Sequence, residues 1–172
     1  LLYAAVLLAV IAGLFAYNIF SKRIGFWKDA AVGLLVVSLY PLAAVIARPS
    51  PSVHLNILYV HPLWLFLTTI AYQMIKDRLD IEGDMFVSHK QTGYRDEALF
   101  VRISKGLLIF ACALTLIPSI YGWCGGIYTA AAITALILSI LAAALKPAAA
   151  IPFVYAEVLV ITAGSALDIF LA

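Results

Sequence analysis

Residues 125–145 read GGIYTAAAITALILSILAAAL, a run of 21 residues without a charged side chain. About 20 apolar residues in an α-helix cross the hydrocarbon core of a bilayer, which is about 30 Å thick. The run is long enough to do so, and its polarity does not alternate as that of a membrane β-strand would. It therefore predicts a transmembrane α-helix.

Five other apolar runs of comparable length lie along the chain. With the first run they predict six transmembrane helices, over residues 1–20, 30–47, 55–75, 104–121, 125–145 and 148–171. The third helix is expected to continue beyond residue 75. We therefore expect an all-α fold, a polytopic transmembrane helical bundle that forms one domain over residues 1–172.

The composition of the whole chain agrees with a membrane protein. Of the 172 residues, 65% are hydrophobic and 12% are charged, and the mean hydropathy is +1.07. Soluble domains carry about 25% charged residues, and a soluble globule of this size has too much surface to hide so many apolar side chains. The net charge of +2 is too small to indicate a nucleic acid as partner. The expected partner is a lipid bilayer.

The basic residues are divided unevenly between the two sides of the predicted bundle. Ten of the eleven Lys and Arg residues lie in the connections after the first, third and fifth helices, and only Arg48 lies on the other side. Short loops rich in Lys and Arg stay in the cytoplasm. We therefore expect an integral membrane protein of the cell inner (plasma) membrane, with the long connection over residues 76–103 in the cytoplasm.

This connection begins with a row of acids. If the third helix continues at 100° per residue, three carboxylates lie within about 60° of one another on one face, and Gln73 joins that face. The three acids are Asp77, Asp80 and Asp84. Carboxylates are hard oxygen ligands for Mg²⁺, whose remaining positions substrate phosphates can fill, and Lys76 is a nearby cation for phosphate oxygens. The pattern predicts a site for Mg²⁺ and a phosphate-bearing substrate. A solvated helix end whose charges only set the topology is the other interpretation.

Two segments resemble motifs of the UbiA superfamily of intramembrane prenyltransferases. Residues 76–84, KDRLDIEGD, match every fixed position of that family's second aspartate-rich motif, KDxxDxEGD. Residues 17–25, YNIFSKRIG, are similar to the YxxxxKRxG segment that ends the family's fourth helix. The order and spacing of the two segments also fit. The resemblance implies that the six helices correspond to helices four to nine of a nine-helix fold.

The chain departs from the family pattern in two places. The family's first motif, NDxxDxxxD, is absent, and we expect it to lie upstream of Leu1, so that the chain is the carboxy-terminal two-thirds of such an enzyme. The segment 89–95, HKQTGYR, matches the family's GxxTLPV only loosely, and the resemblance therefore leaves the acceptor undefined.

The resemblance implies a Mg²⁺-dependent enzyme that transfers a polyprenyl group from a prenyl diphosphate to a hydrophobic acceptor, aromatic or lipid-like, within the membrane. It implies that Asp77, Asp80 and Asp84 are the catalytic metal ligands. It implies substrate-binding roles for Lys22, Arg23, Lys76, Tyr17 and Gln73. Tyr17 and Tyr72 are expected either to line the site or to pack between helices.

Glu157 is the one acid deep inside a predicted span, and an intramembrane carboxylate is a functional candidate by default. It is expected either to act on the acceptor or to be hydrogen-bonded within the bundle. Two other functions remain open. One is a cation-coupled transporter, although no internal repeat is visible. The other is a non-catalytic membrane scaffold related to the enzyme.

Overall fold

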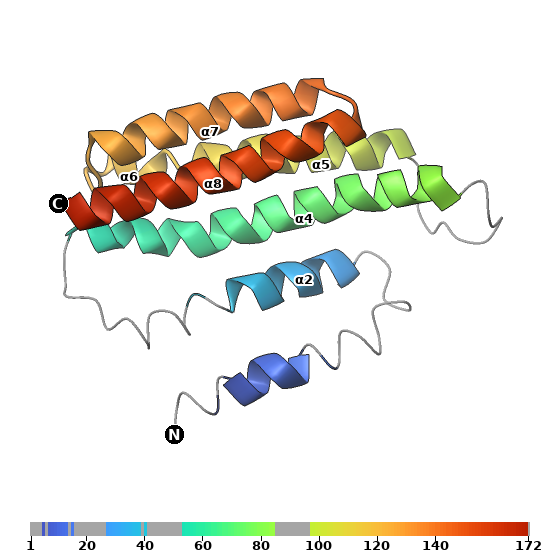
Figure 1. The fold of residues 1–172 in the computed structure, drawn as a ribbon, viewed down its shortest axis with the longest axis horizontal. Helices are drawn as coiled ribbons and strands as arrows, with labels where there is room; N and C mark the ends of the chain where they lie inside the picture. Colours follow the sequence, from blue (N-terminus) through green and yellow to red (C-terminus); the bar gives the residue numbers. More distant parts are fainter. Residues whose placement is uncertain are drawn as a thin grey trace.

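The computed structural model describes residues 5, 7–13, 15, 27–38, 40, 53–84 and 97–171. In these residues every regular element is a helix (Figure 1). The elements are α2 (Trp27–Val37), the 3₁₀ helix η1 (Val53–Asn56), α4 (Ile57–Asp84), α5 (Glu97–Leu114), α6 (Ile117–Ile120), α7 (Gly126–Ala144) and α8 (Pro147–Leu171).

Four helical stretches are long and apolar enough to cross a membrane: Ile57–Leu79, Ala98–Ile120, Gly126–Ala144 and Pro147–Leu171. They confirm the helical membrane bundle and correspond to the third to sixth predicted spans. The first two predicted spans, 1–20 and 30–47, are described only in part, and α2, whose 11 residues begin at Trp27, covers residues 30–37 of the second. The kink expected at Pro41 lies outside the described residues.

Two helix boundaries differ from those expected from hydropathy. α4 continues to Asp84, as the third span was expected to do, so the acidic segment is helical. α5 begins at Glu97 rather than at residue 104. Of the predicted connection over 76–103, residues 76–84 and 97–103 are therefore helical, and 85–96 lie outside the described residues. Both helices extend past the apolar stretch because charged residues such as Arg102 are good helix formers outside lipid.

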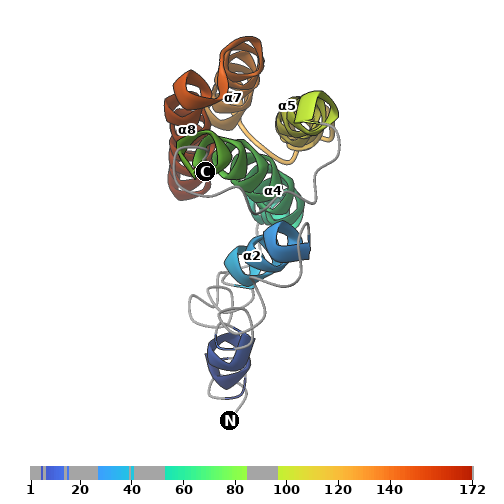
Figure 2. The same cartoon turned by 90° about the vertical axis from the view of Figure 1, so that its right-hand side faces the viewer.

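The helices α4, α5, α7 and α8 form one bundle, with α2 packed on the far side of α4 (Figure 2). α7 and α8 run side by side and approach closely at Gly164. A Cβ atom there would collide with the Cβ of Ala131 on α7. On the other side of α4, a Cβ on Gly33 of α2 would lie 2.8 Å from the ring of Phe66. Glycine permits both contacts because it has no side chain.

The interior of the bundle contains several alanines beside large buried side chains such as Trp64 and Tyr128, and large apolar side chains also cover the outside. Ala71, Ala111, Ala132 and Ala135 are fully buried. Large side chains point away from the bundle on every long helix, among them Phe110, Ile137, Leu159 and Phe170. This is typical of membrane helices, because lipid solvates large apolar side chains and small residues let the backbones approach.

Both ends of α7 are held by side chains from neighbouring helices. At its start, the carboxylate of Asp168 on α8 accepts hydrogen bonds from the backbone N–H groups of Gly125 (2.8 Å) and Tyr128 (3.2 Å). At its end, the ammonium of Lys105 on α5 donates to the carbonyl oxygen of Leu145 (2.9 Å). An acid at the N-terminus and a base at the C-terminus complement the helix dipole and satisfy groups that the helix leaves unpaired.

Candidate functional site

The acidic row lies at the end of α4, where the helix leaves the apolar stretch Ile57–Leu79. Gln73 and Asp77 are half-buried there, and Lys76 is exposed. Asp80 and Asp84 continue the same helix, but their side chains lie outside the described residues. Lys22, Arg23 and Tyr17 also lie outside them. The structure therefore brings Gln73, Lys76 and Asp77 to one end of α4 and leaves the other five predicted site residues as predictions.

Asp77 is held by a lysine that the resemblance did not point to. The ammonium of Lys28, the second residue of α2, donates to both carboxylate oxygens of Asp77, at 2.7 Å and 2.6 Å. The side chains of Lys28 and Asp77 are 27% and 17% exposed, so water screens this ion pair only in part. α2 is thereby tied to the acidic end of α4.

The residue after Lys28 is a buried acid without a hydrogen-bond partner. Asp29 is 0% exposed, and neither of its carboxylate oxygens has a hydrogen-bond partner in the described part of the chain. Burial, and then the charge of Asp77, raise the pKa of Asp29 to about 6, although Lys28 opposes the shift. Buried carboxylates are normally paired or bound to a cation, so this one requires an explanation.

The donor chemistry at this end of the bundle fits a hard divalent cation. Mg²⁺ binds through one or two carboxylates and keeps several waters, and both Asp77 and Asp29 offer oxygen ligands. Asp29 in particular has two buried oxygens that no described donor satisfies. Among the described side chains no group of three His, Cys, Asp or Glu residues forms a ready-made metal cluster. Any complete ligand set must therefore draw on water or on groups outside these residues.

Glu157 occupies a different position, in the middle of the bundle. Its carboxylate is fully buried and accepts hydrogen bonds from Trp64 Nε1 (3.1 Å), Thr68 Oγ1 (3.3 Å) and Ser139 Oγ (2.7 Å). The donors come from α4 and α7, and Glu157 comes from α8. This arrangement corresponds to the expected alternative in which Glu157 is hydrogen-bonded within the bundle.

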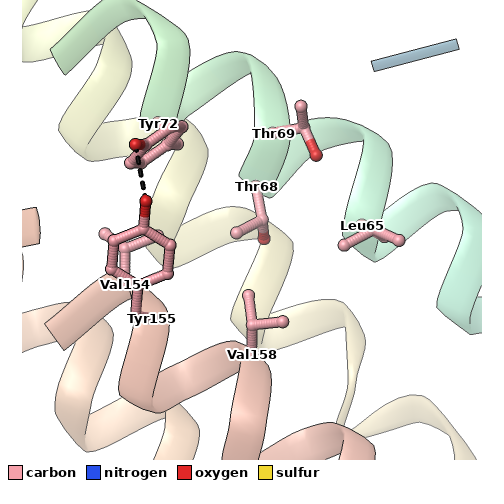
Figure 3. A pocket seen from close by; sticks show the side chains of 7 residues that line it. All are labelled: Leu65, Thr68, Thr69, Tyr72, Val154, Tyr155 and Val158. Carbon is pink, nitrogen blue, oxygen red and sulfur yellow. Dashed lines mark hydrogen bonds between the residues drawn. The ribbon is translucent and has the colours of Figure 1, made fainter. Parts of the chain in front are cut away.

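A groove of about 150 Å³ lies between α4 and α8 (Figure 3), and Thr68 in its wall donates a hydrogen bond to Glu157. Its walls are mostly apolar and consist of Leu65, Thr68, Thr69, Tyr72, Val154, Tyr155 and Val158. The hydroxyl groups of Tyr72 and Tyr155 form a hydrogen bond of 2.7 Å across one end of the groove. Tyr72 thus contacts α8, which corresponds to the expected alternative of packing between helices, and its expected place in the substrate site stays a prediction.

Lys28, Asp29 and Tyr155 were missed by the sequence analysis. Lys28 was counted only as a basic loop residue, and Asp29 precedes the predicted span by one position. An acid in the first turn of a helix is ordinarily explained by the helix dipole. The only available signal was that Lys28 and Asp29 stand at the membrane boundary on the same predicted side as Asp77.

No protein-family model, no curated protein and no solved structure matches the chain. The likeness to prenyltransferases therefore rests on the two sequence segments, and the site described above rests on its own geometry.

Proposed function

We propose that the chain belongs to a Mg²⁺-dependent enzyme of the UbiA type, which transfers a polyprenyl group from a prenyl diphosphate to a hydrophobic acceptor within the membrane. The observation that carries the proposal is the continuation of α4 from an apolar stretch into the segment 76–84. A helical KDRLDIEGD places Asp77, Asp80 and Asp84 in register on one face at the membrane boundary. A diphosphate with an apolar tail would reside at such a boundary.

The reaction breaks the bond between the allylic prenyl carbon and the diphosphate oxygen, and the diphosphate leaves with the electron pair. The acceptor forms a new bond to that carbon and loses a proton. Bound Mg²⁺ would neutralise charge on the diphosphate and make it a better leaving group. Asp77, Asp80 and Asp84 would hold the ion, directly or through water. Lys76, with Lys22 and Arg23, would bind phosphate oxygens.

The groove between α4 and α8 offers an apolar surface for part of the prenyl tail. It is lined by Leu65, Val154 and Val158. Tyr72 lies five residues before Asp77 but about 140° around α4 from it, so the groove and the acidic row lie on different faces of this helix. In this scheme the groove would hold the tail beyond the reacting carbon, and its apolar walls would exclude water.

We also propose that the acidic end faces the cytoplasm, in the cell inner (plasma) membrane. All six Lys and Arg residues in the described part of the chain lie toward the end where α4 finishes and α5 begins. They are Lys28, Lys76, Arg78, Arg102, Lys105 and Lys146. The positive-inside rule then sets the orientation.

The test is prenyl transfer in membranes that contain the longest reading frame encoding this chain. Labelled prenyl diphosphates of several lengths are incubated with aromatic and lipid acceptors, with and without Mg²⁺. We expect labelled lipid product only with Mg²⁺, and a loss of at least about 100-fold in Asp77→Ala or Asp80→Ala, since lost charge stabilisation of this kind costs about 10²–10³ in rate.

Glu82→Ala is the matched control, because Glu82 lies about 140° around the helix from Asp77 and should leave the rate near that of the wild type. Full activity in the Asp77→Ala/Asp80→Ala double variant would contradict the proposal. Cation flux into reconstituted vesicles without any prenyl transfer would instead favour a transporter. The absence of both activities would favour a scaffold.

A further inference from the structure

Asp29 is the one side chain in the described part of the chain that is fully buried, polar and without a hydrogen-bond partner. The other buried acids have found donors. Glu157 accepts three hydrogen bonds and Asp168 accepts two backbone N–H groups. An acid that is neither solvated nor paired is costly to bury, so Asp29 is expected to have a partner that these residues do not supply.

Asp29 faces α4, the helix that carries the acidic row. Gly33 lies one turn further along α2 on the same face, and a Cβ atom added to Gly33 would lie 2.8 Å from the ring of Phe66 on α4. Phe66 and Asp77 are in turn separated by 11 residues, three turns of helix, and so share a face of α4. α2 and α4 run in opposite directions (Figure 1), which brings the start of α2 toward the end of α4. Asp29 and Asp77 therefore lie toward the same end of the contact between α2 and α4.

A cation already occupies part of this space. The ammonium of Lys28 is bound to both oxygens of Asp77, while Asp29, the next residue, has no donor. Lysine is a flexible point charge that can leave one anion for another. A divalent ion can bind two carboxylates at once, whereas the ammonium of Lys28 donates to the carboxylate of Asp77 and not to that of Asp29. The arrangement resembles a metal site in which the ammonium of Lys28 occupies the position of the ion.

We infer that Asp29 and Asp77 together bind a divalent cation, directly or through metal-bound water, and that the ammonium of Lys28 is the resident counter-ion which the metal displaces. In the context of the proposed function, on which this inference builds, Asp29 adds a carboxylate from α2 to the acidic row of α4. The displaced lysine is then free to contact a phosphate oxygen of the substrate.

The probe is Mn²⁺ alone, titrated into the purified full chain in detergent micelles, with free Mn²⁺ followed by electron paramagnetic resonance. We expect Asp29→Asn to weaken Mn²⁺ binding by about 10- to 100-fold, the range seen when a group supporting a metal site is removed. Lys28→Met should tighten binding severalfold, because the competing ammonium is gone. Asp168→Asn makes the same chemical change in a buried acid at the other end of the bundle, and it should leave the affinity unchanged.

Unchanged binding in Asp29→Asn overturns the inference, as does a wild-type chain that binds no Mn²⁺. If Asp29→Asn does not fold, Lys28→Met decides, and unchanged or weaker binding in that variant rejects the site. The outcome is separable from that of the proposed function. If prenyl transfer requires Asp77 but Mn²⁺ binds Asp29→Asn as tightly as the wild type, only the inference is rejected. Mn²⁺ binding that needs Asp29, without any prenyl transfer, rejects only the proposed function.

Discussion

At the scale of single residues, the buried carboxylate of Glu157 accepts three side-chain hydrogen bonds. Its partners Trp64, Thr68 and Ser139 lie 93, 89 and 18 positions away in the sequence. Each donor would be left unsatisfied in an apolar interior if the acid were removed, and an unsatisfied buried donor costs about 1–3 kcal/mol. Glu157 therefore stabilises the contact of α8 with α4 and α7.

We expect Glu157→Ala to destabilise the bundle by about 3 kcal/mol or more, because each of three buried donors loses its acceptor at about 1–3 kcal/mol. Glu157→Gln should cost about 1 kcal/mol or less, because its amide oxygen still accepts from Trp64 or Thr68. Thermal or detergent unfolding of the purified protein measures both changes. Equal stability of Glu157→Ala and the wild type would show that the hydrogen bonds contribute nothing.

A local motif was enough to predict Asp77, but not the residue that pairs with it. Asp77 was predicted from a local motif, and the structure places it at the end of a helix, as expected. Its partner Lys28 lies 49 positions away, and no periodic pattern joins the two. The partners of Glu157 are equally remote. Long-range pairs depend on how helices pack, whereas hydropathy reports only whether each helix enters the membrane.

At the scale of helices, the close contact between α7 and α8 depends on Gly164. A methyl group at this position would collide with Ala131 on the facing helix. Gly106 on α5 offers a matched comparison, because a Cβ atom there would meet nothing within 4 Å. The two glycines therefore separate the packing effect of a methyl group from its effect on helix propensity.

Gly164→Ala should destabilise the bundle by about 1–3 kcal/mol, the usual cost of overpacking a tight contact. Gly106→Ala should be neutral or stabilising by up to about 1 kcal/mol, since alanine is the better helix former. Both variants are compared by detergent unfolding. A stable Gly164→Ala protein would mean that α7 and α8 can separate without loss.

Hydropathy predicted the transmembrane helices well, but it predicted the residues at which they begin and end less well. Residues 125–145 and 148–171 were predicted as spans, and the helices run over Gly126–Ala144 and Pro147–Leu171. The start of α5 was placed seven residues too late because hydropathy drops at Arg102 and Lys105, although the helix continues through them. Charge ends a membrane span but does not end a helix. The side chains that bond the two ends of α7 belong to α5 and α8, so the sequence next to α7 could not predict them.

At the scale of the whole molecule, the described charges are separated along the bundle. Lys76 and Lys146 lie toward one end, while Tyr121 lies in the turn between α6 and α7 at the other. If the basic end is cytoplasmic, the two ends differ in their access to a reagent that cannot cross the membrane.

We expect that a membrane-impermeant maleimide added to intact cells will label Tyr121→Cys, whose parent side chain is 68% exposed, but not Lys146→Cys at the basic end, whose parent side chain is also exposed. The native Cys124 is first replaced by serine, whereas Cys112 is buried. Both positions should react once the membrane is opened with detergent. The reverse pattern in intact cells would invert the orientation.

The hydrogen bonds of Glu157 also bear on the order in which the protein is made. Its three donors lie on α4 and α7, which are synthesised before α8. α8 thus brings its acid into the bilayer after all three donors have been synthesised, so the carboxylate does not have to lie in lipid without a partner. A ribosome that stopped before α8 would leave behind a bundle with exposed donors and no carboxylate, a form that quality-control proteases could distinguish from the finished protein.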